Sequence, residues 1–140
     1  MILWLKADSQ ENFQKAGFAY CQVTRKQAEL RKLNLNLTTE PGSEFIPAGG
    51  GQGKHLTGYG WRAKIKTARF ISREKLIEYI LKKNLQNTFS PKSAEHYILY
   101  EFDQVSPLQK LALSEVHKKY SSGSPYMAVS CTWDEILKSQ

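Results

Sequence analysis

The sequence predicts an α+β fold: a small, mostly antiparallel β pseudobarrel with three or four flanking helices. Three observations lead to this prediction. Five or six short stretches have the β-branched, aromatic or alternating character of strands. Short helical patterns separate them, and few strand–helix–strand units are long enough for a doubly wound parallel sheet. The 140 residues, 41% of them hydrophobic, fit a single domain spanning residues 1–140.

The N-terminal part is predicted to begin strand, helix, strand. Residues 2–6 are typical of a short buried strand. Asp8 and Glu11 form a capping-box pattern for a short helix that Gly17 is placed to end. The aromatic and β-branched residues 18–23 favour a second strand.

The next segments are less uniform. Residues 24–33 are strong helix formers, so propensity predicts a helix there. Residues 44–47 form a short apolar segment that leads into a run of glycines. Residues 61–67 alternate strictly, with apolar residues at odd positions and basic residues at even positions from 62 to 66, which predicts a strand with one face in the core.

The C-terminal half combines helices and strands. Ser72 is placed to cap a helix that runs to Asn84. Residues 96–105 favour a central strand, and Pro107 is well placed in the first turn of a following helix. Residues 126–130 favour another strand. The expected buried stripes are Leu76, Ile77, Ile80 and Leu81 in the first helix, and Leu108, Leu111, Ala112 and Val116 in the second. Thr132 and Glu135 form the capping pattern of a last helix.

Positive charge is concentrated in the middle of the chain. The whole chain has a formal charge of +7, and residues 61–92 hold nine basic and two acidic residues, so that this segment accounts for +7 by itself. Such a local field attracts polyanions, of which nucleic acid is the most abundant. Arg62, Lys64 and Lys66 are predicted to project from one strand face about 6.8 Å apart, and Arg69 and Arg73 extend the patch. A solvated surface without a partner is the alternative.

The glycine-rich segment around Lys54 resembles a phosphate-binding loop only in part. Small residues and a lysine are present, but His55 occupies the position of the magnesium-binding hydroxyl and no helix pattern follows. This argues against a typical nucleoside triphosphatase. A loop whose amides and Lys54 close over a bound phosphate, or a plain hairpin connection, remains compatible with the sequence.

The sequence predicts no metal site and no cofactor. Its three histidines, His55, His96 and His117, lack metal-ligand spacing. Only Cys21 and Cys131 occur, which indicates a reducing, cytoplasmic compartment. No apolar run approaches the roughly 18 residues of a membrane span, and the first residues do not have the order of a secretory signal.

Two stretches resemble known domain families. Residues 3–8, Leu-Trp-Leu-Lys-Ala-Asp, resemble the opening of EVE domains, and residues 26–31, Lys-Gln-Ala-Glu-Leu-Arg, resemble the Lys-x-x-Glu-x-Arg signature of ASCH domains. Both families belong to the PUA-like superfamily, and segments 41–46 and 60–65 resemble later strands of those domains. The resemblance implies a module that binds RNA or DNA and has a pocket for a modified base. It also implies that residues 26–31 are strand or turn rather than helix.

The leading hypothesis is therefore a module that binds single-stranded or modified-base nucleic acid. Its expected phosphate contacts are Arg62, Lys64, Lys66, Arg69 and Lys54. Its expected pocket residues are Trp4, Lys6, Arg31, Tyr59 and Trp61, with Lys26 and Glu29 beside Arg31.

Two alternatives remain open. One is a metal-independent amidohydrolase or ribonuclease of ASCH type, in which the resemblance assigns catalysis to Lys26, Glu29 and Thr24; in this chain Gln27 replaces the usual threonine. The other is a regulatory or inhibitory protein that binds an acidic protein partner. The oligomeric state is not predicted.

Overall fold

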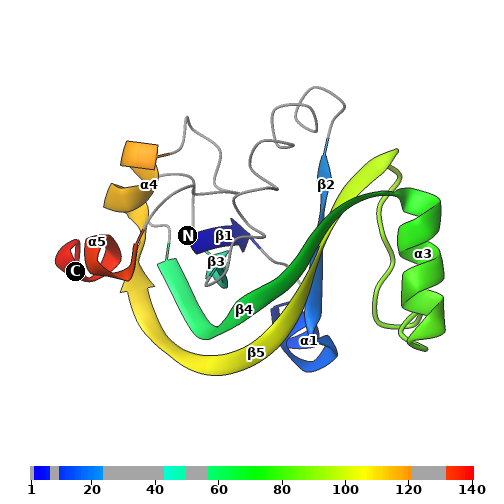
Figure 1. The fold of residues 1–140 in the computed structure, drawn as a ribbon, viewed down its shortest axis with the longest axis horizontal. Coiled ribbons are helices and arrows are strands. Elements are labelled where there is room, and N and C mark those ends of the chain that lie inside the picture. Colours follow the sequence, from blue (N-terminus) through cyan, green and yellow to red (C-terminus); the bar gives the residue numbers. More distant parts are fainter. Residues whose placement is uncertain (1, 7–9, 24–42, 50–56, 121–131) are drawn as a thin grey trace.

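The fold is built on two long antiparallel strands that bend together into a U (Figure 1). They are β4 (Thr57–Ser72) and β5 (His96–Ala112), which pair along their whole length. The structure is a computed structural model, and it describes residues 2–6, 10–23, 43–49, 57–120 and 132–140.

Three shorter strands complete the described sheet, whose order is β1-β3-β4-β5-β2. β1 (Ile2–Lys6) runs parallel to β3 (Glu44–Gly49), whereas β3 pairs antiparallel with β4 and β2 (Phe18–Val23) pairs antiparallel with β5. The predicted α+β class with a mostly antiparallel sheet is thus confirmed. The predicted closure is not seen, because β1 and β2 are the opposite edges of the described sheet and do not pair with each other.

Bulges interrupt the β4–β5 ladder at three places. Asp103 is an extra residue on β5 and Lys66 is an extra residue on β4, on either side of the pair formed by Ile65 and Phe102. A third shift places Gly58 opposite Leu111 and Gly60 opposite Leu108. Each bulge reverses the alternation of side chains beyond it and bends the strand.

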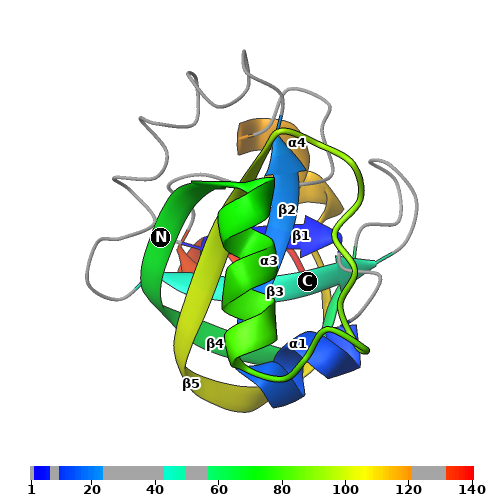
Figure 2. The ribbon, with the colours of Figure 1, turned by 90° about the vertical axis from the view of Figure 1, so that its right-hand side faces the viewer.

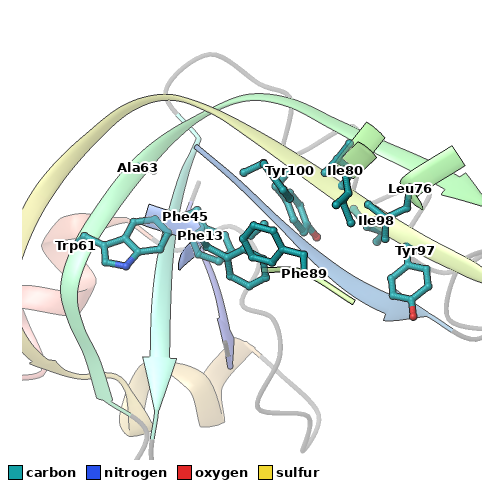
Figure 3. Packing of buried hydrophobic residues seen from close by; sticks show 13 residues of the cluster. Phe13, Phe45, Trp61, Ala63, Leu76, Ile80, Phe89, Tyr97, Ile98 and Tyr100 are labelled. Carbon is teal, nitrogen blue, oxygen red and sulfur yellow. The ribbon is translucent and has the colours of Figure 1, made fainter. Parts of the chain in front are cut away.

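The two faces of the bent β4–β5 pair differ. The inner face lies inside the bend and carries Trp61, Ala63 and Phe45 of the neighbouring β3, all at most 2% exposed (Figure 3). The outer face is the side on which α3 (Arg73–Lys82) lies along the strands (Figure 2).

The core forms two clusters of buried hydrophobic residues. The larger one contains residues from both faces of the sheet, together with side chains from α1 (Gln10–Ala16), α3 and the following loop, such as Phe13, Leu76 and Phe89. The smaller one lies near the other end of β5 and contains Ile46, Ala48, Leu113, Val116 and Ile136.

The helices mostly follow the sequence patterns. α1 ends at Gly17, whose φ of +78° suits glycine. α3 begins after Ser72, whose hydroxyl accepts from the backbone N–H of Lys75. α5 (Trp133–Lys138) has the predicted capping box between Thr132 and Glu135. None of the helices in the described ranges is long and apolar enough to cross a membrane.

Two helical predictions are wrong in detail. Pro107 begins no helix, because Leu108 to Ala112 continue β5 and the helix starts only at Ser114, as α4 (Ser114–Tyr120). Pairing with β4 outweighs the local helical pattern there. In α3 the buried side chains are Leu76 and Ile80, whereas Leu81 is 49% exposed, since the helix turns Tyr79 rather than Leu81 toward the sheet.

Candidate nucleic-acid interface

The four predicted phosphate-binding residues of the middle segment all lie on β4. Alternation with the buried Trp61 and Ala63 places Arg62 and Lys64 on the outer face. Lys66 is the extra residue of the bulge and is exposed. Because this bulge reverses the alternation, Arg69 also lies on the outer face, where it contacts Glu101 of β5. We call these four residues the basic strip.

One end of the basic strip is held by an acidic and an aromatic side chain. The guanidinium of Arg62 lies 3.8 Å from the Glu44 carboxylate and 4.9 Å from the centre of the Trp133 ring. The indole N–H of Trp133 donates to the same carboxylate at 3.2 Å. Glu44 thereby neutralises part of the charge of Arg62, and α5 is fastened to β3 and β4. The exposed part of Arg62, 41% of its side chain, still faces solvent.

The centre of the basic strip consists of Lys64 and Lys66. Both side chains are exposed, and neither forms an ion pair with any residue in the described ranges. Glu44 stands opposite Lys64 on β3 but directs its carboxylate to Arg62 and Trp133. Two cationic side chains are thus available to an anionic ligand.

The other end of the basic strip is a polar cluster around Glu101. Its carboxylate accepts hydrogen bonds from the hydroxyls of Thr67, at 2.7 Å, and Tyr79, at 3.1 Å. The Arg69 guanidinium lies 2.9 Å from the same carboxylate and 5.8 Å from the centre of the Tyr79 ring. The ammonium of Lys83 lies over that ring at 5.0 Å. The cluster joins β4, β5 and α3, and half of the Arg69 side chain remains exposed.

The protonation of this cluster follows from its contacts. Burial by itself would raise the pKa of Glu101, but the Thr67 hydrogen bond, the charge of Arg69 and the Tyr79 hydrogen bond together bring it below its ordinary value. Burial and the neighbouring Glu101 raise the pKa of Tyr79. Glu101 is therefore ionised and Tyr79 neutral at physiological pH, which suits a structural anchor better than an acid–base pair.

Arg73 does not extend the basic strip as its sequence position suggested. Its guanidinium donates to the backbone carbonyls of Pro91 and Lys92, both at 3.2 Å. The Tyr97 hydroxyl also donates to the Lys92 carbonyl. Arg73 thus holds the segment that follows α3 against the sheet, where Phe89 is buried.

Trp61, one of the predicted pocket residues, lies in the core of the described structure. Its side chain is 2% exposed and lies beside Phe45 (Figure 3). The ring centres of Phe45 and Phe102 are each 5.5 Å from that of Trp61. Trp61 therefore offers no exposed face to a base. Its indole Nε1 is buried and has no hydrogen-bond partner among the residues that the structure describes.

The remaining predicted residues are not placed in this interface. Thr24, Lys26, Glu29, Arg31 and Lys54 lie outside the described residues. The backbones of Trp4 and Lys6 belong to β1 and that of Tyr59 to β4, while their side chains are not among those described. Their binding or catalytic roles stay predictions.

Sequence reasoning missed the partners that hold the two arginines. Neither Glu101 nor Lys83 was among the residues predicted for the site. The acidic partners come from β3 and β5, so no local spacing reveals them. Within the described ranges no group of three or more histidine, cysteine or acidic side chains could hold a metal ion.

Comparison of the chain with protein families, curated proteins and solved structures finds no match. A function for this chain is therefore inferred from the geometry of the basic strip.

Proposed function

We propose that this chain is a nucleic-acid-binding domain that holds phosphates along the basic strip. One observation carries the proposal: Lys64 and Lys66 project from the middle of β4 without an ion pair in the described part of the chain. They lie between two arginines whose guanidinium groups are fixed by carboxylates and aromatic rings. The two lysines supply point charges, and the exposed part of each arginine can add a phosphate contact.

The location of the charge supports a polyanion over a single small anion. Residues 62 to 69 span about 23 Å of extended strand at roughly 3.3 Å per residue. Cations spread over such a length match a charged polymer, whose neutralisation releases counterions. The bent, mostly antiparallel sheet is compatible with a PUA-like domain, and a reducing cytoplasmic compartment is part of the same proposal.

The test is the salt dependence of oligonucleotide binding. We expect the double variant Lys64→Gln/Lys66→Gln to bind a fluorescein-labelled 12-nucleotide single strand more weakly than the original chain. If both lysines contact phosphate, the slope of log K against log salt should fall in magnitude by about 1.4, since each contact on a single strand contributes about 0.7.

The matched control is Lys110→Gln/Lys138→Gln. These two lysines are also exposed, and their replacement removes the same two charges at positions outside the basic strip. The control should keep the original slope. Equal slopes in the two double variants would show that only the overall charge matters, and binding without salt dependence would rule out the basic strip.

A further inference from the structure

The second half of β4 has an open edge in the described sheet. β3 pairs with β4 only as far as Lys64, and the N–H of Ile65 donates to the carbonyl of Ser43 at 3.0 Å. From Lys66 to Ser72, β4 pairs with β5 on one side and with none of the described strands on the other. Over this stretch β4 is an edge strand of the described sheet, so side chains on both of its faces border the unpaired edge.

Phe70 is an unusual side chain at this edge. It is 36% exposed, and the other exposed large hydrophobic residues in the described ranges, Leu81, Val105 and Leu137, are all aliphatic. Its neighbour Arg69 lies on the outer face, so Phe70 projects from the inner face. Because the ring stays partly in water at this position, its burial contributes less to stability than that of a core aromatic side chain.

The Phe70 ring is supported from one side. It is stacked on the ring of His96, with centres 4.9 Å apart and planes 20° from parallel. His96 lies at the start of β5. Its Nδ1 has no hydrogen-bond partner within the described ranges, and the Glu95 carboxylate is 3.9 Å away. Because one side of Phe70 rests on His96, its exposed surface is the opposite side and the ring edge. A supported ring with an exposed side is what a nucleobase needs for stacking.

The distances allow one ligand to reach both features. Lys66 and Phe70 are four residues apart on an extended strand, or about 13 Å. A flexible single strand can place a phosphate at the lysine and a base at the ring, whereas the bases of a duplex are stacked on each other and cannot.

We propose that Phe70, supported by His96, stacks on a base of single-stranded nucleic acid whose backbone follows Lys64, Lys66 and Arg69 along the open edge of β4. This inference rests on the proposed function and adds a preference for unpaired bases. The site recognises a base through its aromatic face and therefore tolerates different sequences.

The test compares two labelled 12-mers of equal charge, oligothymidylate and an abasic strand. The original chain should bind oligothymidylate more tightly. Phe70→Leu keeps an apolar side chain but removes the ring, and it should weaken oligothymidylate binding about tenfold while leaving abasic binding unchanged. Phe70→Trp should bind at least as tightly as the original. The control Val105→Ala, at a residue of similar exposure, should change neither affinity. A 12-mer of oligouridylate in parallel shows whether RNA is bound in the same way.

A measurement on the original chain keeps the test valid if Phe70→Leu does not fold. Ring-proton resonances of Phe70 should move upfield when oligothymidylate is added and should not move with the abasic strand.

The possible failures are distinguishable. If both 12-mers bind equally and Phe70→Leu has no effect, base stacking is wrong but the basic strip stands. If neither 12-mer binds, the proposed function fails as well. If Phe70→Leu instead turns a dimer into a monomer in sedimentation and leaves oligonucleotide binding unchanged, the ring serves contact between copies and the inference is overturned.

Discussion

Replacing Glu101 with glutamine tests the polar cluster that joins β4, β5 and α3. The glutamine side chain has nearly the same size as glutamate but lacks its negative charge. In the original chain the charged carboxylate accepts hydrogen bonds from Thr67 and Tyr79 and pairs with Arg69. Hydrogen bonds to a charged group contribute about 1.5–3 kcal/mol and those to a neutral group about 1 kcal/mol. The ion pair adds less than about 1 kcal/mol because half of the Arg69 side chain is exposed to solvent. We therefore expect the free energy of unfolding to fall by about 1.5 kcal/mol at pH 7.

The pH dependence of this loss follows from the direction of the pKa shift. The pKa of Glu101 in the folded chain lies below its ordinary value of 4.5. Its ionised form thus stabilises the fold fully above pH 4.5, and this contribution is lost as the pH falls through the folded pKa. Urea unfolding followed by circular dichroism should give a constant difference between Glu101→Gln and the original chain from pH 8 to about pH 5.5. The difference should shrink at lower pH. In thermal unfolding at pH 7 the midpoint should drop by about 5 °C.

The same variant has an opposite effect on binding. Without the Glu101 carboxylate, Arg69 loses its ion pair and can contact a phosphate instead. Glu101→Gln should therefore bind an oligonucleotide more tightly, although its fold is less stable. A stability difference that is as large at pH 3 as at pH 7 would refute the assigned ionisation. Weaker binding by a folded Glu101→Gln would refute the competition between carboxylate and phosphate for Arg69.

Three further variants test the packing. Gly58→Ala should lower stability by about 1–3 kcal/mol, because the new Cβ would lie 2.8 Å from Cγ2 of Ile46; an unchanged urea midpoint would contradict the close packing. Leu76→Ala should lower the free energy of unfolding by about 2–5 kcal/mol because Leu76 is buried, whereas Leu81→Ala should lower it by less than about 0.5 kcal/mol because Leu81 is half-exposed. Similar losses for the two variants in urea titrations would refute the orientation of α3. Thr132→Ala should cost about 1 kcal/mol through loss of the capping box, and unchanged amide hydrogen exchange in α5 would show that the cap is not needed.

The sequence predicted those elements whose local pattern agrees with their tertiary pairing. β1, β2, the basic part of β4, α1, the start of α3 and the cap of α5 are of this kind. The prediction was wrong after Pro107, where Leu108 and Leu111 are spaced by three residues as on a helix. In the structure both pack against the smaller core cluster from a strand, because the bulge adds one residue between them. A bulged strand can thus show the same spacing of apolar residues as a helix, and the pattern of one segment alone cannot distinguish a bulged strand from a helix.

The basic strip was predicted only in part for a related reason. Regular alternation places Arg62 and Lys64 on one face, and the structure agrees. It would place Arg69 on the opposite face, and only the bulge at Lys66 returns it to the outer face beside Glu101. The neutralising carboxylates are brought in by β3 and β5 from positions 44 and 101, which are distant in sequence. Their effect on each arginine therefore depends on register, which the sequence alone does not determine.

The contact between Arg62 and Trp133 gives the chain an intrinsic optical signal. The indole of Trp133 is half-buried beneath a guanidinium at the end of the basic strip, whereas the indole of Trp61 is enclosed in the core. A ligand that draws Arg62 away from the ring changes the surroundings of Trp133 and leaves those of the enclosed Trp61 unchanged. Because the chain has a third tryptophan, Trp4, the Trp133→Phe variant is needed to isolate the signal. Emission spectra recorded with and without Trp133→Phe can then follow occupancy of the surface in solution, without any attached dye.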